Sequence, residues 1–111
     1  MRNLLIVEDN RISGTLIQAK VSSVFDFSIY WAKSLEEAVV LLEEQNNNFF
    51  AALLDYVLPD AQKGEIVDEV VRRGIPSIVF TATVTEEVRK ELWKKNIVDY
   101  VIKDNTQSIE Y

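Results

Sequence analysis

The stretch Phe49-Phe50-Ala51-Ala52-Leu53-Leu54-Asp55 is a short apolar run that ends at a carboxylate. Continuous rather than alternating hydrophobicity is typical of a strand that is buried on both faces of a parallel sheet. Further apolar runs lie on both sides of it, at intervals long enough to hold a helix. These runs are Leu4 to Val7, Phe27 to Trp31, Ser77 to Phe80 and Val98 to Ile102.

The segments between the runs have helical periodicity and recognisable ends. Asn10 is expected to cap the first helix, while Ser34 to Glu37 and Thr83 to Glu86 read as capping boxes of the second and fourth helices. Gly74 can close the third helix before Pro76 stops it. The positions expected to face inward are Ile12, Leu16, Ile17 and Val21, then Leu35, Ala38, Val39 and Leu42, then Ile66, Val67, Val70 and Val71, and finally Val84, Val88 and Leu92.

Strands that alternate with helices predict an α/β fold of the flavodoxin-like type. This is an open parallel five-stranded sheet of order 2-1-3-4-5, with helices on both faces. The length is that of one domain, spanning residues 1–111. After the last strand only residues 103 to 111 remain, too few for a last covering helix. We therefore expect a domain truncated from a longer protein, or one that covers this face by self-association as a homodimer.

Composition excludes several kinds of chemistry. The chain has no cysteine and no histidine, which removes disulfides, thiolate nucleophiles and imidazole bases. Its 18 acidic and 12 basic residues give a net charge of -6, which argues against nucleic acid or an anionic membrane as a partner. The apolar run near the N-terminus stops at Glu8, far too early for a signal peptide or a membrane span. These features predict a cytoplasmic protein.

Polar residues follow the predicted strands at their carboxyl ends, where open parallel sheets bind ligands. They are Glu8 and Asp9 after the first strand, Asp55 at the end of the third, Thr81 after the fourth and Lys103 after the fifth. Carboxylates about 4 Å apart repel by roughly 4 kcal/mol per pair at an effective dielectric constant of about 20. Magnesium relieves this repulsion, because it prefers oxygen ligands and readily takes one or two carboxylates together with phosphate oxygens.

A carboxylate beside a metal, with a lysine and a hydroxyl within reach, is suited to accepting a phosphoryl group. Asp55 is the natural nucleophile, and Lys103 would stabilise the charge of the acyl phosphate. Thr81 could donate a hydrogen bond to a phosphate oxygen once phosphate is present. Because that contact depends on phosphate, it would act as a conformational switch.

Four blocks of this sequence resemble the signature of the receiver domain of two-component response regulators. They are Leu5 to Asn10, Leu53 to Pro59, Phe80 to Ala82 and Tyr100 to Lys103, in the order found in that family. The resemblance covers the whole chain. It implies a phosphorylation-dependent signalling switch with Mg²⁺ as cofactor.

The resemblance also implies a role for each matching residue. Asp55 is the phosphoacceptor, Glu8 and Asp9 are the acidic pair for Mg²⁺, and the backbone carbonyl of Val57 is a further metal ligand. Lys103 is the lysine of the phosphorylation site. The side chain of Val57, two positions after the phosphoacceptor, is apolar and cannot help to orient an attacking water. The rate of self-catalysed dephosphorylation therefore does not follow from the resemblance.

The switch residues implied by the resemblance are Thr81 and Tyr100, the latter being the aromatic three positions before the lysine. Asp104 replaces the proline that commonly follows this lysine, so the cis peptide typical of that position is expected to be absent or to involve a non-proline residue. The sequence from Val98 to Asn105, with Ser108 to Tyr111, is similar to first receivers of tandem-receiver diguanylate cyclases.

The partners implied are a histidine kinase or a histidine phosphotransfer protein, and an output domain such as a diguanylate cyclase in the same full-length chain. Other binders of this fold class lack support. A flavodoxin-type cofactor site needs a Ser/Thr/Gly-rich loop where Glu8 stands, and a dinucleotide site needs more glycines than Gly14, Gly64 and Gly74 provide. A phosphorylation-independent docking or dimerisation module remains the alternative.

Overall fold

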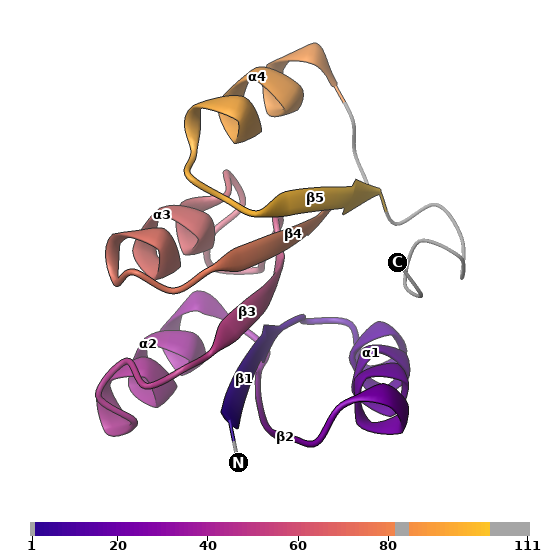
Figure 1. Ribbon diagram of the computed structural model, residues 1–111. Helices are drawn as coiled ribbons and strands as arrows, with labels where there is room; N and C mark the ends of the chain where they lie inside the picture. The colour runs from indigo at the N-terminus through magenta and orange to yellow at the C-terminus, as the bar shows by residue number, and fades with distance from the viewer. Residues whose placement is uncertain (1, 82–84, 103–111) are drawn as a thin grey trace.

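The computed structural model describes residues 2–81 and 85–102 of the chain as one layered α/β domain (Figure 1). Strands and helices alternate from the N-terminus onward. The strands are β1 (Arg2–Val7), β2 (Phe27–Ala32), β3 (Ala51–Asp55), β4 (Ser77–Thr81) and β5 (Asp99–Ile102). The helices are α1 (Arg11–Val24), α2 (Leu35–Glu44), α3 (Glu65–Arg72) and α4 (Glu86–Lys94).

The five strands form a parallel sheet in the order β2-β1-β3-β4-β5, as the sequence predicted. Each connection between strands that are consecutive in the chain carries a helix, as parallel strands require. The register aligns the strand ends, with Val7 paired to Leu54 and Asp55 paired to Phe80. The residues that follow β1 and those at the end of β3 therefore meet at one edge of the sheet.

The sheet separates two apolar layers (Figure 1). The larger layer lies between the sheet and α2, α3 and α4, and it contains fully buried side chains such as Leu54 and Leu42. The smaller layer lies under α1, where Ile17 packs against Leu4 and Ile6. This division follows from the alternation of side chains along each strand, because neighbouring residues face opposite sides of the sheet.

Most of the predicted helix ends are confirmed. The side-chain oxygen of Asn10 accepts a hydrogen bond from Ser13 N at 3.0 Å, and Ser34 Oγ accepts one from Glu37 N at 3.1 Å. Gly74 has a φ of +78° and donates its N–H to the carbonyl of Val71 (2.9 Å), while Ile75 N–H reaches the carbonyl of Val70 (3.4 Å). This pair of bonds is a Schellman motif, which favours glycine at the left-handed position.

The predicted start of the fourth helix was wrong. The helix begins at Glu86, and Thr85 rather than Thr83 is its N-cap, with the Thr85 side chain accepting from Val88 N at 3.1 Å. Two threonines two positions apart each offer a capping hydroxyl, so the sequence alone did not decide between them. Thr83 and Val84 lie outside the described residues.

The predicted inward face of the first helix was also partly wrong. Ile12 and Leu16 are 74% and 42% exposed, whereas Gly14 and Ile17 are buried and Val21 is half-buried. Gly14 is the point of closest approach, since a Cβ atom there would lie 2.2 Å from Cζ2 of Trp31. A helix that approaches through Gly14 turns its Gly14, Ile17 and Val21 stripe inward and leaves the other apolar stripe outside.

No helix in the described part of the chain is both long enough and apolar enough to cross a membrane.

Candidate functional site

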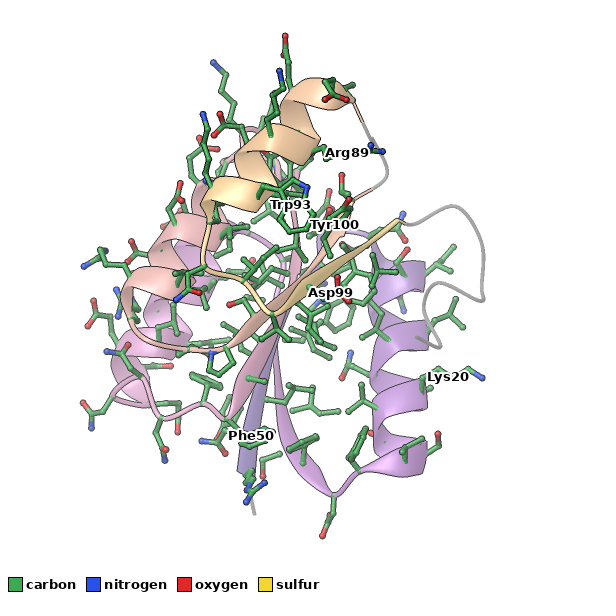
Figure 2. All side chains as sticks on the ribbon, turned by 45° about the horizontal axis from the view of Figure 1, so that its top comes forward. Lys20, Phe50, Arg89, Trp93, Asp99 and Tyr100 are labelled. Atoms are coloured by element: carbon green, nitrogen blue, oxygen red, sulfur yellow. The ribbon has the colours of Figure 1, made fainter. Side chains whose placement is uncertain are left out.

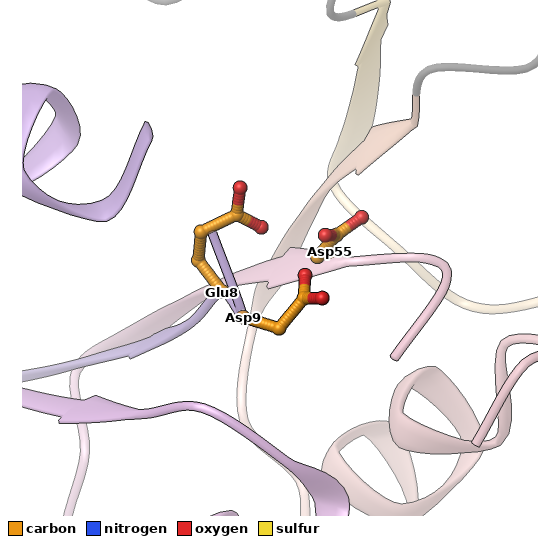
Figure 3. A group of neighbouring side chains, drawn as sticks. All are labelled: Glu8, Asp9 and Asp55. Atoms are coloured by element: carbon orange, nitrogen blue, oxygen red, sulfur yellow. The ribbon is translucent and has the colours of Figure 1, made fainter. Parts of the chain in front are cut away.

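Three carboxylates converge at the carboxyl ends of β1 and β3 (Figure 3). Glu8, Asp9 and Asp55 each offer one oxygen, and these oxygens all lie within 4.8 Å of one another. Glu8 and Asp55 are almost completely buried, with 1% and 7% of their surface exposed, while Asp9 is exposed. The predicted grouping of these three residues at one sheet edge is therefore what the structure shows.

The chemistry of this donor set fits a hard divalent cation. Magnesium and manganese take oxygen ligands, and a site with two buried carboxylates and an exposed third leaves room for water or phosphate oxygens in the remaining positions. Unit charges 4.8 Å apart repel by roughly 3.5 kcal/mol per ionised pair at an effective dielectric constant of about 20. A bound cation would remove this cost.

The segment after β3 forms a tight turn next to the acidic cluster. Val57 N donates to Asp55 Oδ1 at 3.4 Å, which folds the carboxylate toward the start of the segment. Leu58 and Ala61 exchange two backbone hydrogen bonds of 3.1 and 3.2 Å across this turn. The side chain of Val57 is 45% exposed, so it lies at the open side of the segment.

Asp60, in the middle of this turn, binds the N-terminus of α2. Its carboxylate oxygens accept hydrogen bonds from Leu35 N (2.9 Å) and Glu36 N (3.0 Å) at the start of α2. These two bonds lower the pKa of Asp60 below its usual value. The turn that follows the phosphoacceptor candidate Asp55 is thereby attached to α2.

The two predicted switch residues lie on neighbouring strands. Thr81, at the end of β4, is 1% exposed, and Tyr100 on β5 is half-buried against the larger apolar layer. Val79 pairs with Tyr100, so Thr81 and Tyr100 project from the same face of the sheet, one diagonal step apart. Tyr100 and the exposed Trp93 of α4 both line a pocket of about 140 Å³ (Figure 2).

Lys103 and the peptide bond between Lys103 and Asp104 lie outside the described residues. Their predicted roles and geometry stay predictions.

Sequence reasoning missed two contacts of the segments that carry the acidic residues or follow them. Trp31, which the sequence placed only at the end of an apolar run, donates its indole N–H to the carbonyl oxygen of Glu8 at 2.8 Å. Asp60 carried no signal of its contact with α2. Asp60 follows Pro59, which favours a turn, but this pattern does not identify the backbone groups that Asp60 reaches.

A parallel sheet of this order, with an acidic cluster after β1 and β3, defines a class of protein. It is the fold of CheY-like receiver domains of response regulators, and the resemblance predicted from the sequence is confirmed by strong structural neighbours of that class. No model of a protein family matches the sequence.

Individual relatives extend this likeness. The chain is 28% identical over 110 residues to the methanogenesis regulatory protein FilR1 of Methanothrix harundinacea (strain 6Ac), covering 92% of this chain and 24% of FilR1. It is 31% identical to a two-component system response regulator/GGDEF domain protein of solved structure, with a TM-score of 0.86, covering 100% of this chain and 44% of that one. The chain thus spans about a quarter and under half of these two proteins.

Two further solved structures share the fold at 21% identity. One is a CheY-like response regulator receiver domain protein from Methanospirillum hungatei JF-1, with a TM-score of 0.81 over 95% of this chain and 83% of that one. The other is the Mn²⁺-bound form of the response regulator Rcp1, with a TM-score of 0.85 over 99% of this chain and 87% of that one. Receiver-fold neighbours of this chain therefore include a metal-bound form.

Proposed function

We propose that this domain is a phosphorylation-dependent receiver in which Asp55 accepts a phosphoryl group with Mg²⁺ bound at the acidic cluster. The observation that carries the proposal is the position of Asp55 within 4.8 Å of Glu8 and Asp9 at the carboxyl edge of the sheet. A buried carboxylate at the end of a strand, flanked by two more carboxylates, has little structural value in itself. It becomes useful when a cation and an incoming phosphoryl group share the site.

The donor of the phosphoryl group is a phosphohistidine on a histidine kinase or a histidine phosphotransfer protein, because this chain has no histidine. A carboxylate oxygen of Asp55 attacks the phosphorus atom, a P–O bond forms, and the P–N bond to the donor imidazole breaks. The imidazole nitrogen leaves with the bonding electron pair and takes up a proton. The product is an acyl phosphate on Asp55.

Each neighbouring residue has a part in this step. Mg²⁺, when bound, neutralises charge on the transferring phosphoryl oxygens. Glu8 and Asp9 hold the cation through their side chains, and the carbonyl of Val57 provides a further oxygen. Lys103, by its resemblance to the family lysine, stabilises the negative charge of the product.

The structural response starts at Thr81. Its hydroxyl turns toward the new phosphate oxygens, which draws the end of β4 inward. Tyr100 projects from the same face one diagonal step away and borders the pocket of about 140 Å³, so the change can reach the surface formed by α4 and β5. We propose this surface as the one that an output domain reads.

The GGDEF-containing structure that is 31% identical supports the finer proposal that the output is a diguanylate cyclase domain in the same full-length chain. A kinase donor and a cyclase output would both place the domain in the cytoplasm.

The test is phosphorylation with a small-molecule phosphodonor such as acetyl phosphate, in Mg²⁺, followed by intact-mass measurement. One added phosphoryl group is expected in the wild type and none in Asp55→Asn, a substitution that keeps the size of the side chain. Loss of the adduct on removing Mg²⁺ with a chelator would link the metal to the reaction. Labelling of Asp55→Asn at wild-type levels would refute the assignment of Asp55.

The alternative function predicts a different pattern. A docking or dimerisation module that works without phosphorylation would show no change in shape or assembly with beryllium fluoride, a mimic of the acyl phosphate. Size-exclusion chromatography with light scattering, with and without beryllium fluoride and Mg²⁺, distinguishes the two functions.

A further inference from the structure

Trp31, a residue of β2, contacts both the main chain of Glu8 and Gly14 of α1. We infer that Trp31 is a positioning residue for the cation site: its indole N–H fixes the peptide between Glu8 and Asp9 and so sets the direction of both carboxylates. This inference rests on the proposed function, because it concerns the same site.

The main chain of Glu8 is held at both of its polar groups by β2. Its N–H donates to the carbonyl of Ala32 at 3.0 Å, which continues the ladder between β1 and β2 by one step. Its carbonyl oxygen accepts the Trp31 Nε1–H at 2.8 Å. That carbonyl belongs to the peptide that joins Glu8 to Asp9, so the indole bond fixes the plane from which the Asp9 side chain departs.

The indole is in turn held in place. Gly14 of α1 lies directly against the ring, where a Cβ atom would come within 2.2 to 2.9 Å of three ring atoms. The ammonium of Lys33 lies 5.2 Å from the ring centre, within cation–π distance. The ring therefore has little freedom to move away from Glu8.

The C-terminal end of the Glu8–Asp9 segment is fixed separately. Asn10 follows Asp9 and is the N-cap of α1, with its side-chain oxygen accepting from Ser13 N at 3.0 Å. Asp9 thus lies between two fixed residues, one held by Trp31 and the other by the helix. This arrangement is what a metal site needs, since ligand direction is usually set by partners outside the ligand shell.

A purely structural role for Trp31 is the competing explanation, because the ring also packs against the smaller apolar layer. The two roles differ in what a substitution changes. A packing residue affects the free energy of unfolding alone, whereas a positioning residue also changes cation affinity in the folded protein.

The experiment uses Trp31→Phe, which keeps an aromatic ring but removes the N–H donor. The control is Ile29→Ala, which removes apolar contacts from the same strand and the same apolar layer and leaves the Trp31–Glu8 bond in place. The affinity for Mg²⁺ is measured by isothermal titration calorimetry under conditions where urea titrations show each variant to be folded. We expect roughly tenfold weaker binding in Trp31→Phe, at the low end of the loss seen when an outer partner of a metal ligand is removed, and unchanged binding in Ile29→Ala.

A spectroscopic arm tests the same contact without mutating it. Trp93 is 78% exposed on α4, and Trp93→Phe leaves Trp31 as the only tryptophan. Its fluorescence should change on adding Mg²⁺, with the midpoint found by calorimetry, because the indole touches the peptide between two ligands. An unchanged Trp31 signal at saturating Mg²⁺ would count against the inference.

The outcomes separate the inference from the proposed function. Equal Mg²⁺ affinity in the wild type and Trp31→Phe would overturn the inference and leave the proposed function intact. Equal weakening by Trp31→Phe and Ile29→Ala would show that the effect is general destabilisation, which also overturns it. No Mg²⁺ binding by the wild type would overturn both.

Discussion

Asp60→Ala tests whether the turn after Asp55 is attached to α2 through a carboxylate. In the wild type the first two N–H groups of α2, from Leu35 and Glu36, are both satisfied by Asp60, at 2.9 and 3.0 Å. Glu37 N–H is satisfied by Ser34 Oγ, so this contact is unaffected by the substitution. The variant therefore removes two charge-assisted hydrogen bonds and leaves the local cap intact.

The magnitude follows from capping. Loss of a capping side chain costs about 0.5 to 2 kcal/mol, and a carboxylate at a helix N-terminus adds about 0.3 to 1 kcal/mol. Asp60 is exposed, so water can replace part of both contributions. We expect a loss of about 1 kcal/mol in the free energy of unfolding at pH 7, measured by urea titration. Asp60→Asn keeps one acceptor oxygen and should lose about half as much.

The pH dependence provides a second check. Hydrogen bonds from the α2 backbone lower the pKa of Asp60 from its ordinary value of 3.8. A group whose pKa is lowered by folding stabilises the folded state above the unfolded pKa, and this contribution disappears as the pH falls through the folded pKa. The difference between the wild type and Asp60→Ala should thus be constant from pH 7 to about pH 5 and shrink below about pH 4. Equal urea midpoints at pH 7, or a difference that does not shrink in acid, would refute this reasoning.

Two further predictions use matched pairs of variants. Gly64 and Gly74 have nearly the same positive φ (+76° and +78°), but a Cβ at Gly64 would lie 2.4 Å from Cε2 of Tyr56, whereas nothing lies within 4 Å at Gly74. Urea titration should show that the free energy of unfolding falls by about 1 to 2 kcal/mol in Gly74→Ala and by clearly more in Gly64→Ala. Equal losses in the two variants would show that the Tyr56 contact is unimportant. Leu54 is fully buried in the larger apolar layer, whereas Leu53 is half-buried against the smaller one. Leu54→Ala should therefore lower the free energy of unfolding by about 2 to 5 kcal/mol, and Leu53→Ala should lower it distinctly less. The reverse order would contradict the assignment of the main core.

The sheet and the acidic cluster could be predicted because both depend on local patterns. The apolar runs are continuous and short, which identifies buried parallel strands, and topology then places their ends together. Asp55 needed only to end its strand, and Glu8 and Asp9 needed only to follow theirs, for the three to meet.

The parts that failed depend on how elements pack. The inward face of α1 is set by the contact of Gly14 with Trp31, and no periodicity within the helix contains that information. Both stripes of α1 are apolar, so Ile12 and Leu16 looked as suitable as Gly14 and Ile17. The large side chain of Trp31 on β2 determines which stripe of α1 faces inward, because only the stripe with Gly14 leaves room for it.

The contacts of Trp31 and Asp60 were missed for a related reason. The Trp31 indole reaches a carbonyl 23 residues earlier, and Asp60 reaches an amide 25 residues earlier. Hydrogen bonds between side chain and backbone over such separations have no sequence signature, because any backbone group is an equivalent partner. Only the folded chain identifies which group is near.

These two contacts are made by the elements on either side of the short connection between β2 and α2. Trp31 near the end of β2 holds the segment that carries Glu8 and Asp9, and the first amides of α2 hold the turn that follows Asp55. One oxygen from each of the three carboxylates lies within 4.8 Å of the other two, and two unit negative charges at that distance repel by roughly 3.5 kcal/mol at an effective dielectric constant of about 20. Neither segment is a regular element that could resist this force alone. By holding both segments, β2 and the start of α2 oppose this repulsion and preorganise the carboxylates for the cation that the proposed function requires.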